Sequence, residues 1–254
     1  KKKTLNSLVI DAGNSLIKAA LFENDQIIAK YSSKGSTPKG FSSFLAELPS
    51  RPSNAILSSV RKDSSELEHE LNHFGINNVL NLRSGLKLPV RIHYKTPETL
   101  GADRIANASM AVVLVPAGNA MVIDIGTCIK YDLVATEKTY LGGAISPGIK
   151  IRYKGLSAYT GRLPYFKNLK EEFPELVGSS TEGSIRSGVE HGMLCEMNGM
   201  LQSFEKSYPG LALILTGGDH LRFKDKLEKK PIFADADLTL KGLHEILKIN
   251  AFEK

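Results

Sequence analysis

Apolar residues form two similar sets of short runs, one near the start of the sequence and one near its middle. In each set the first run ends at an aspartate, Asp11 or Asp124, and a glycine follows two positions later. Continuous or alternating apolar runs of this length are typical of strands. The predicted strands are 8–11, 17–22 and 27–31 in the first set and 120–124, 129–135 and 140–145 in the second. The repetition predicts two β-meanders and an internal duplication at domain scale.

Between and after these meanders, apolar residues recur with helical spacing. The predicted helices are 63–74, a segment that opens at 96–97 and runs toward 115, 181–208 and 238–249. A buried strand over 211–215 ends in Thr216-Gly217-Gly218-Asp219. Because the turn-rich segment 116–119 directly precedes the second meander, we expect two α/β domains, residues 1–117 and 118–254.

The composition is that of a folded protein with a sizeable core, since 42% of the 254 residues are hydrophobic. The two cysteines match no metal spacing, no apolar stretch reaches membrane-spanning length, and no signal peptide precedes the first strand. We therefore expect a cytoplasmic protein. The net charge of +6 comes from lysines interspersed with acids, without the alternating aromatic residues of a nucleic-acid platform. We expect neither nucleic acid nor a membrane as a partner, whereas an anionic substrate suits the basic balance.

The turn after Asp11 has the residue types of a phosphate site. Residues 11–18 read Asp-Ala-Gly-Asn-Ser-Leu-Ile-Lys. Backbone N–H groups of a glycine turn can surround phosphate oxygens, Asn14 and Ser15 can donate further hydrogen bonds, and Lys18 supplies a cation. A carboxylate such as Asp11 can hold Mg²⁺, directly or through water. Taken alone, this turn is more simply read as an ordinary hairpin.

The second copy of the turn favours a phosphate site over an ordinary hairpin. Asp124 again ends a strand, Gly126 supplies the turn, and Thr127 can donate its hydroxyl group to a phosphate oxygen. Two such turns on duplicated domains favour a nucleotide site, which the Gly217-Gly218 segment after a later strand supports.

A candidate acceptor site lies between the two turns, over residues 94–104. An alcohol acceptor needs a carboxylate to take its proton, and an anionic substrate needs hydrogen-bond donors such as a guanidinium group. Asp103 and Arg104 supply both groups next to Gly101, which lets a ligand approach closely. Physical reasoning alone slightly favours the simpler view that both are charged residues near the start of a helix.

The duplicated turns and the later Gly-Gly-Asp resemble the actin, sugar-kinase and Hsp70 superfamily. Within it, the order of five motifs over residues 8–250 resembles that of type III pantothenate kinases. The motifs are 11–18, Gly-Ala-Asp-Arg at 101–104, Asp-Ile-Gly-Thr at 124–127, Leu-Gly-Gly-Ala-Ile-Ser-Pro-Gly at 141–148 and Thr-Glu-Gly-Ser-Ile at 181–185. The resemblance implies two duplicated actin-like, ribonuclease H-like domains, each a mixed sheet with flanking helices, and an ATP cleft between them.

The resemblance also implies an activity and its partners. These are phosphorylation of pantothenate by ATP with Mg²⁺, the first step of coenzyme A biosynthesis, by a cytoplasmic homodimer that requires K⁺ or NH₄⁺. Asp103 would be the catalytic proton acceptor, Asp11 the Mg²⁺ ligand and Asp124 the ligand of the monovalent cation. The residues implied to bind ATP are Asp11, Ala12, Gly13, Asn14, Ser15, Leu16, Ile17, Lys18 and Thr127. Those implied to bind pantothenate are Tyr94, Gly101, Ala102, Asp103, Arg104 and Thr181.

Three positions depart from the family pattern. Ser15 replaces the usual threonine and keeps its hydroxyl group, and Cys128 replaces a common alanine. Lys130 stands where the family usually has an uncharged residue. The sequence does not settle whether this lysine points into the cleft or toward solvent.

Two other features have a simpler and a more specific interpretation. His69-Glu70-Leu71-Asn72-His73 matches a zinc-protease signature, but the helical stripe of Leu67, Leu71 and Phe74 predicts that both histidines face solvent. The helix from 181 carries an apolar stripe that we interpret as core, while its interspersed glycines leave a dimer contact open.

Two rival functions also remain open. A kinase of the same superfamily with another alcohol substrate would keep the phosphate turns. A non-enzymatic regulator on this fold would be expected to lack Asp103 or one of the two turn aspartates, and all three are present.

Overall fold

The protein was analysed as a computed structural model that describes residues 6–13, 15–35, 38–59, 65–82, 85–166 and 171–251. Of the expected site residues, Asn14 lies outside these ranges. The chain forms two compact units: unit 1 contains Lys1–Leu114 and Asp237–Lys254, and unit 2 contains Val115–Ala236. The expected boundary at 117/118 lies close to the point, between Leu114 and Val115, where the chain passes from unit 1 to unit 2. The difference is the last segment of the chain, which belongs to unit 1 rather than to the second half.

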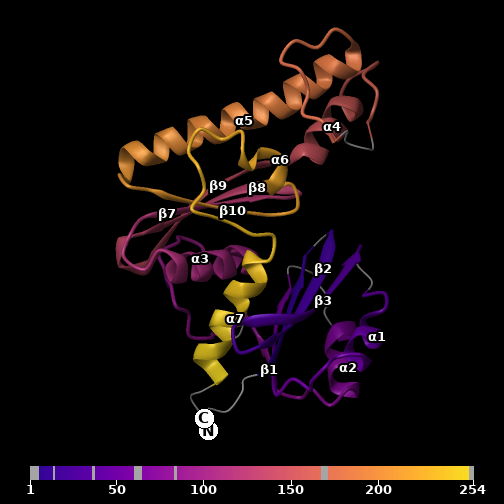
Figure 1. Ribbon diagram of the computed structural model, residues 1–254, viewed down its shortest axis with the longest axis vertical. Helices are drawn as coiled ribbons and strands as arrows, with labels where there is room; N and C mark the ends of the chain where they lie inside the picture. Colours follow the sequence, from indigo (N-terminus) through magenta and orange to yellow (C-terminus); the bar gives the residue numbers. More distant parts are fainter. Residues whose placement is uncertain are drawn as a thin grey trace. The chain divides into compact units, whose positions relative to one another are not determined.

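Unit 1 is a mixed five-stranded sheet with helices on both faces (Figure 1). Its strands lie in the order β3-β2-β1-β4-β5, with β1, β2 and β3 antiparallel as the meander predicts, and β4 and β5 added in parallel. The elements are β1 (Asn6–Ala12), β2 (Leu16–Glu23), β3 (Gln26–Lys34), α1 (Phe41–Ala46), β4 (Asn54–Ser59), α2 (Ser65–His73), β5 (Val79–Asn81), β6 (Arg91–Ile92), a 3₁₀ turn (Pro97–Thr99), α3 (Ala102–Leu114) and α7 (Leu238–Ala251).

The two faces of this sheet have separate cores, because successive side chains of a strand point to opposite faces. On one face Leu8 and Ile10 of β1 pack with Phe41 of α1 and Leu71 of α2. On the other face Val9 packs with residues of α3 and α7, among them Ala106, Leu243 and Ile246. Helix α7 joins unit 1 because its apolar side chains complete this second core.

Helices α3 and α7 cross at Gly242, where a side chain has no room. A Cβ atom at this position would lie 1.9 Å from the carbonyl oxygen of Ala106. We therefore expect Gly242→Ala to force the helices apart and to lower the free energy of unfolding by about 1–3 kcal/mol. Urea denaturation followed by far-UV circular dichroism measures this change.

The matched control for that prediction is Gly192→Ala, in the interior of the long helix of unit 2. A Cβ atom at Gly192 would have no atom within 4 Å. This substitution should be neutral or stabilise by up to about 1 kcal/mol, because alanine is the better helix former. Equal destabilisation by both variants would contradict the role of the close crossing.

The expected helix from 96–97 toward 115 is two elements. Pro97–Thr99 forms a single 3₁₀ turn, and Leu100, with a ψ of 125°, is extended before α3 begins at Ala102. Leu100 N–H closes the 3₁₀ turn by donating to the carbonyl oxygen of Pro97, and the extended backbone of Leu100 separates this turn from α3. The prediction was right about α3 and wrong about where it starts.

Unit 2 repeats the meander and carries its own helices (Figure 1). Within this unit the strand order is β11-β10-β7-β8-β9; β7, β8 and β9 are antiparallel, and β10 and β11 are parallel additions. The elements are β7 (Ala120–Ile125), β8 (Cys128–Ala135), a 3₁₀ turn (Thr136–Lys138), β9 (Thr139–Pro147), α4 (Ile149–Ala158), α5 (Thr181–Ser207), β10 (Ala212–Thr216), α6 (His220–Lys224) and β11 (Phe233–Ala234).

The apolar stripe of α5 is core, as its spacing predicts. Ile185, Val189, Met193 and Met197 are buried against Ile123, Ile125 and Ile129 of the sheet and Tyr153 of α4. Met200 and Phe204 are partly buried at the edge of the same cluster. One face of the β7–β8 hairpin therefore supports α5, while Asp124 and Lys130 point to the other face.

The zinc-protease signature lies on α2, and its histidines face solvent as predicted. Leu67 and Leu71 are buried, whereas His69 and His73 are exposed. Glu70 accepts a hydrogen bond from the Ser42 hydroxyl group at 2.6 Å. Among the described residues, no three His, Cys, Asp or Glu side chains are grouped so that they could hold a metal ion. Across these same residues, every helix is too short or too polar to span a bilayer.

Candidate active site

The first phosphate turn joins β1 and β2 in unit 1. The backbone N–H of Gly13 donates to the carbonyl oxygen of Leu16 at 3.0 Å and closes the turn. Strand register places Lys18 directly opposite Asp11, and both side chains are half-buried. Ser15 is exposed at the tip of the turn, where its hydroxyl group can reach a ligand. The expected ATP-binding residues that the structure describes here thus occupy one hairpin.

Asp11 is suited to a divalent metal bound mainly by water and phosphate. The hydroxyl group of Ser58, on the neighbouring strand β4, donates to Asp11 Oδ1 at 3.4 Å and helps to orient the carboxylate. Mg²⁺ commonly uses one or two carboxylates together with water and substrate phosphates. A half-buried carboxylate at the end of a strand fits that requirement.

The second phosphate turn joins β7 and β8 in unit 2 and is supported by the start of α4. Gly126 N–H donates to the carbonyl oxygen of Cys128 at 3.1 Å, and Gly148 N–H donates to that of Thr127 at 3.0 Å. A Cβ atom at Gly148 would lie 2.1 Å from the Gly126 carbonyl oxygen, so only glycine allows this approach. Thr127 is exposed, which leaves its hydroxyl group accessible to a ligand.

The loop after β10 lies against the same turn. Gly217 has a φ of 92°, and a Cβ atom there would lie 2.5 Å from Asp124 Oδ1. Asp219 N–H donates to the carbonyl oxygen of Ile125 at 2.9 Å. Burial raises the pKa of Asp219, against the opposing charges of Lys150 and Arg222. Three glycine-containing segments therefore meet around the end of β7.

Asp124 is paired with the lysine that departs from the family pattern. Lys130 stands opposite Asp124 in the β7–β8 register, and its Nζ atom lies 2.7 Å from Asp124 Oδ2. Only 17% of the lysine side chain and 11% of the aspartate side chain are exposed. A pair that is this well buried is screened by water far less than a surface ion pair.

That pairing bears on the monovalent cation that the family resemblance implies at Asp124. The ammonium group of Lys130 already neutralises the carboxylate, and Gly217 closely approaches its other oxygen. A second cation on Asp124 would have to sit next to the ammonium charge. The residues around Asp124 therefore do not suit the binding of a free monovalent cation by this carboxylate.

The candidate acceptor segment is held at the start of α3. Asp103 Oδ1 accepts the backbone N–H of Arg104 at 2.9 Å, and a negative charge in a first helical turn is favoured by the helix dipole. A Cβ atom at Gly101 would lie 2.5 Å from Asp103 Oδ1, so any larger residue at this position would clash with the carboxylate group. Asp103 is half-buried, while Arg104 and Ala102 are buried and Tyr94 is half-buried. The carboxylate thus has a fixed position and remains partly accessible.

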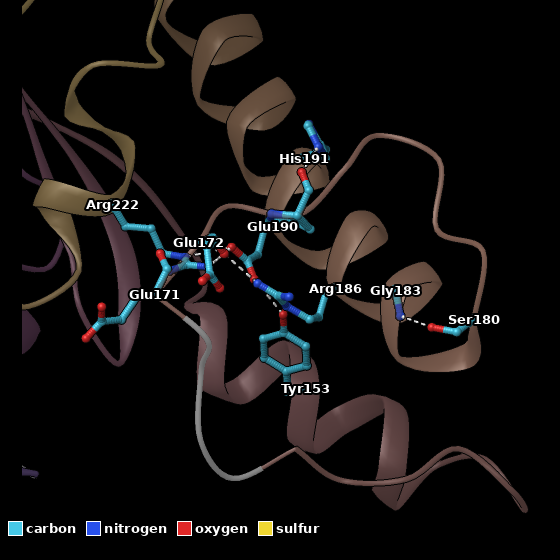
Figure 2. Close-up of polar contacts among 10 residues, drawn as sticks. Tyr153, Glu171, Glu172, Ser180, Gly183, Arg186, Glu190, His191 and Arg222 are labelled. Carbon is cyan, nitrogen blue, oxygen red and sulfur yellow. Dashed lines mark hydrogen bonds and ion pairs between the residues drawn. The ribbon is translucent and has the colours of Figure 1, made fainter.

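Thr181 opens α5 in unit 2 and lines a groove between α4 and α5. Ser180 caps this helix by accepting the Gly183 N–H at 3.0 Å (Figure 2). The groove has a volume of about 910 Å³. Its lining is mostly apolar, including Ile151, Leu156 and Val189, with Arg152 as its one charged residue.

A buried carboxylate, Glu190 of α5, links side chains of α4 and α6 (Figure 2). It accepts the Tyr153 hydroxyl group of α4 at 2.8 Å and the Arg222 Nε of α6 at 2.6 Å, and Arg222 Nη2 contacts it as well. Arg186 Nε lies 3.7 Å away. Arg222 also donates to the carbonyl oxygens of Glu171 and Glu172. Because α6 directly follows the Gly217–Asp219 loop, Glu190 helps to fix that loop.

Reasoning from sequence missed three features of this site. The support by Gly148 lies in a recognised motif, but nothing in the motif shows which backbone it approaches. The pairing of Lys130 with Asp124 depends on the register of the β7–β8 hairpin, in which Ile125 pairs with Ile129, and the motif alone does not fix that register. Glu190 had no signal, because a single glutamate in a long helix normally faces solvent.

Two duplicated α/β units, each with an Asp-x-Gly turn at the end of its first strand, give this protein an actin-like fold. The fold is similar to that of a Baf family protein from Campylobacter jejuni, with a TM-score of 0.60, 22% identity and coverage of 96% of this chain and 98% of the other. It is also similar to an inorganic polyphosphate/ATP-glucomannokinase from Arthrobacter sp. strain KM, with a TM-score of 0.52, 14% identity and coverage of 96% and 99%. These two similarities concern the fold alone.

The sequence comparisons identify the family. A family model described as type III pantothenate kinase matches residues 7–203. The chain is 39% identical over 244 residues to a type III pantothenate kinase from Phocaeicola vulgatus, covering 96% of this chain and 98% of the relative. It is 40% identical over 245 residues to another from Christiangramia forsetii, with the same coverage. The chain belongs to the type III pantothenate kinase family.

Proposed function

We propose that this protein transfers the γ-phosphoryl group of ATP to the primary hydroxyl group of pantothenate, the first step of coenzyme A biosynthesis. Membership of the family, with a relative aligned over 96% of the chain and the Gly-Ala-Asp-Arg segment in place at the start of α3, carries this proposal. Because the reaction consumes ATP, we place the enzyme in the cytoplasm.

In the proposed reaction the roles fall to the residues of the two turns and to Asp103. The hairpin of residues 11–18 and Thr127 bind the nucleotide, with Asp11 holding Mg²⁺. When bound, Mg²⁺ neutralises phosphate charge as the phosphoryl group transfers. The hydroxyl oxygen of pantothenate attacks the γ-phosphorus atom in line, and ADP leaves. Asp103 accepts the proton of that hydroxyl group.

The substrate is held by the groups around that carboxylate. Arg104 binds pantothenate as a hydrogen-bond donor, and Tyr94, Gly101, Ala102 and Thr181 complete its contacts. In phosphoryl transfer most of the catalysis comes from positioning and charge neutralisation, so the fixed position of the Asp103 carboxylate is central to the proposed reaction.

An ADP-release assay tests this function. ADP release should require pantothenate and should be much slower with a panel of other small alcohols. Release with another alcohol but not with pantothenate would identify a different kinase of the same class. Nucleotide binding without ADP release, whatever the acceptor, would favour a regulator.

We further infer that the active form is a homodimer and that the groove between α4 and α5 contributes to the contact. The groove is mostly apolar, and Ile151 in its lining is 39% exposed. A second copy that covered the groove would remove this apolar surface from water.

Ile151→Asp is therefore expected to weaken the dimer about tenfold or more, because a carboxylate would be buried without a partner. Light scattering coupled to size-exclusion chromatography over a range of protein concentrations measures the change. Leu221→Asp, at an exposed apolar residue of α6 outside the groove, should leave the dimer unchanged. A wild-type monomer at every concentration, or equal effects of both variants, would exclude this interface.

A further inference from the structure

The two phosphate turns are alike in one respect that their shared motif does not include. In each hairpin a lysine on the second strand stands directly opposite the aspartate one residue before the end of the first strand: Lys18 opposite Asp11, and Lys130 opposite Asp124. In the second hairpin the Lys130 ammonium group lies 2.7 Å from the carboxylate. The duplication thus extends to a cation beside each turn.

The position of Lys130 is fixed by the fold. Its strand β8 lies between β7 and β9, and its backbone is held in register on both sides. The alternation of side chains places Lys130 and Asp124 on the face away from the Ile123, Ile125 and Ile129 core. The ammonium group is therefore held at the end of β7, two residues before the Gly126–Thr127 turn.

We propose that the ammonium group of Lys130 serves as a built-in monovalent cation for Asp124, so that this enzyme works without added K⁺ or NH₄⁺. A lysine ammonium group can take the place of a free ion here, because it carries the same single charge as K⁺ and donates hydrogen bonds as NH₄⁺ does. The inference rests on the proposed function in assigning nucleotide phosphates to the neighbouring turn, and on the family resemblance in placing a monovalent cation at Asp124.

A tethered cation also has an entropic advantage over a free one. A free ion must be recruited from solution, and its occupancy depends on concentration, whereas Lys130 is present at the carboxylate at all times. The ion pair keeps Asp124 neutralised beside Gly126 and Thr127, where the negative charge of the phosphates would otherwise be opposed by an unpaired carboxylate.

The experiment compares the wild type with Lys130→Ala in KCl and in choline chloride, each at about 0.1 M so that general screening is equal. Two readouts are taken. One is kcat/KM for pantothenate in the ADP-release assay. The other is the midpoint of thermal unfolding, with and without ATP and Mg²⁺, which does not depend on turnover. Lys229→Ala is the matched control, because it removes the lysine of another ion pair, with Glu205 at 2.6 Å, away from the turn.

For the wild type and Lys229→Ala we expect kcat/KM and the unfolding midpoint to agree between the two salts, within about twofold for the rate. In Lys130→Ala the freed carboxylate should bind an added ion. Its kcat/KM should then be about tenfold or more higher in KCl than in choline chloride, and only in this variant should K⁺ specifically raise the unfolding midpoint.

A wild type that is activated or stabilised specifically by K⁺ would overturn the proposal. So would a folded Lys130→Ala variant with no response to K⁺ in either readout. If the wild type releases no ADP in any salt, the proposed function fails. The thermal unfolding measurements still decide whether Lys130 takes the place of a cation.

Discussion

Replacing Asp103 with asparagine is expected to lower kcat for pantothenate phosphorylation by about 10²- to 10⁴-fold, the usual contribution of a general base. Asparagine keeps a side-chain oxygen that can accept the Arg104 N–H, so the start of α3 should be preserved. What the variant loses is the group that takes the proton of the substrate. The ATP dissociation constant, measured by calorimetry, should stay within about threefold of the wild-type value, because proton acceptance adds nothing to nucleotide binding.

Glu98→Gln is the matched control for this prediction. Glu98 is an exposed acid in the 3₁₀ turn just before α3. Its replacement by glutamine removes one negative charge near Asp103 and leaves the Gly101–Arg104 segment unchanged. Its turnover should be close to that of the wild type. Near-normal turnover of Asp103→Asn, or equal losses in both variants, would exclude Asp103 as the base.

Replacing Glu190 with alanine is expected to lower the free energy of unfolding of unit 2 by about 3–5 kcal/mol, the cost typical of breaking a buried ion pair. The side chain of Glu190 is fully buried between Arg186 and Arg222, and the Tyr153 hydroxyl group donates to it. Truncation would leave the guanidinium groups without their counter-charge. Hydrogen-exchange mass spectrometry should show protection lost in α5 and α6 and retained in β1 and β4 of unit 1.

Two further variants separate charge burial from a general loss of contacts. Lys229→Ala breaks an ion pair whose side chains are each about a third exposed, and should cost less than about 1 kcal/mol. Glu190→Gln keeps hydrogen-bonding atoms but no charge, so it should fall between the wild type and Glu190→Ala. If Glu190→Ala were as stable as Lys229→Ala, the carboxylate would not be the centre that we describe.

The parts of the fold that could be predicted are those with a local signal. The two meanders follow from short apolar runs that end at Asp11 and Asp124, and the α5 stripe follows from helical spacing. Strand β4 was missed because Ala55, Ile56 and Leu57 are all buried, and so short an apolar run shows neither helical nor alternating periodicity. Which unit α7 joins depends on packing against residues far away in sequence, which no local pattern records.

The candidate site divides in the same way. Residue types that suit phosphate or proton transfer could be recognised in the turns and at Asp103, because the chemistry is carried by short motifs. The closeness of Gly148 and Gly217 to the second turn depends on loops that meet only in three dimensions. The orientation of Lys130 lies between these cases. Its side chain must alternate with those of Ile129 and Tyr131, but its place opposite Asp124 depends on three residues, 126–128, separating the paired Ile125 and Ile129.

The return of α7 to unit 1 has a consequence for the order of folding during synthesis. Every residue of unit 2 leaves the ribosome before α7 does, at a rate of about 5–20 residues per second. Until then, the sheet face formed by Val9, Ala20 and Ile56 lacks the helix that completes its core. Unit 2 can therefore finish folding first, whereas unit 1 exposes an apolar surface for several seconds and is the part of the nascent chain for which chaperones matter most.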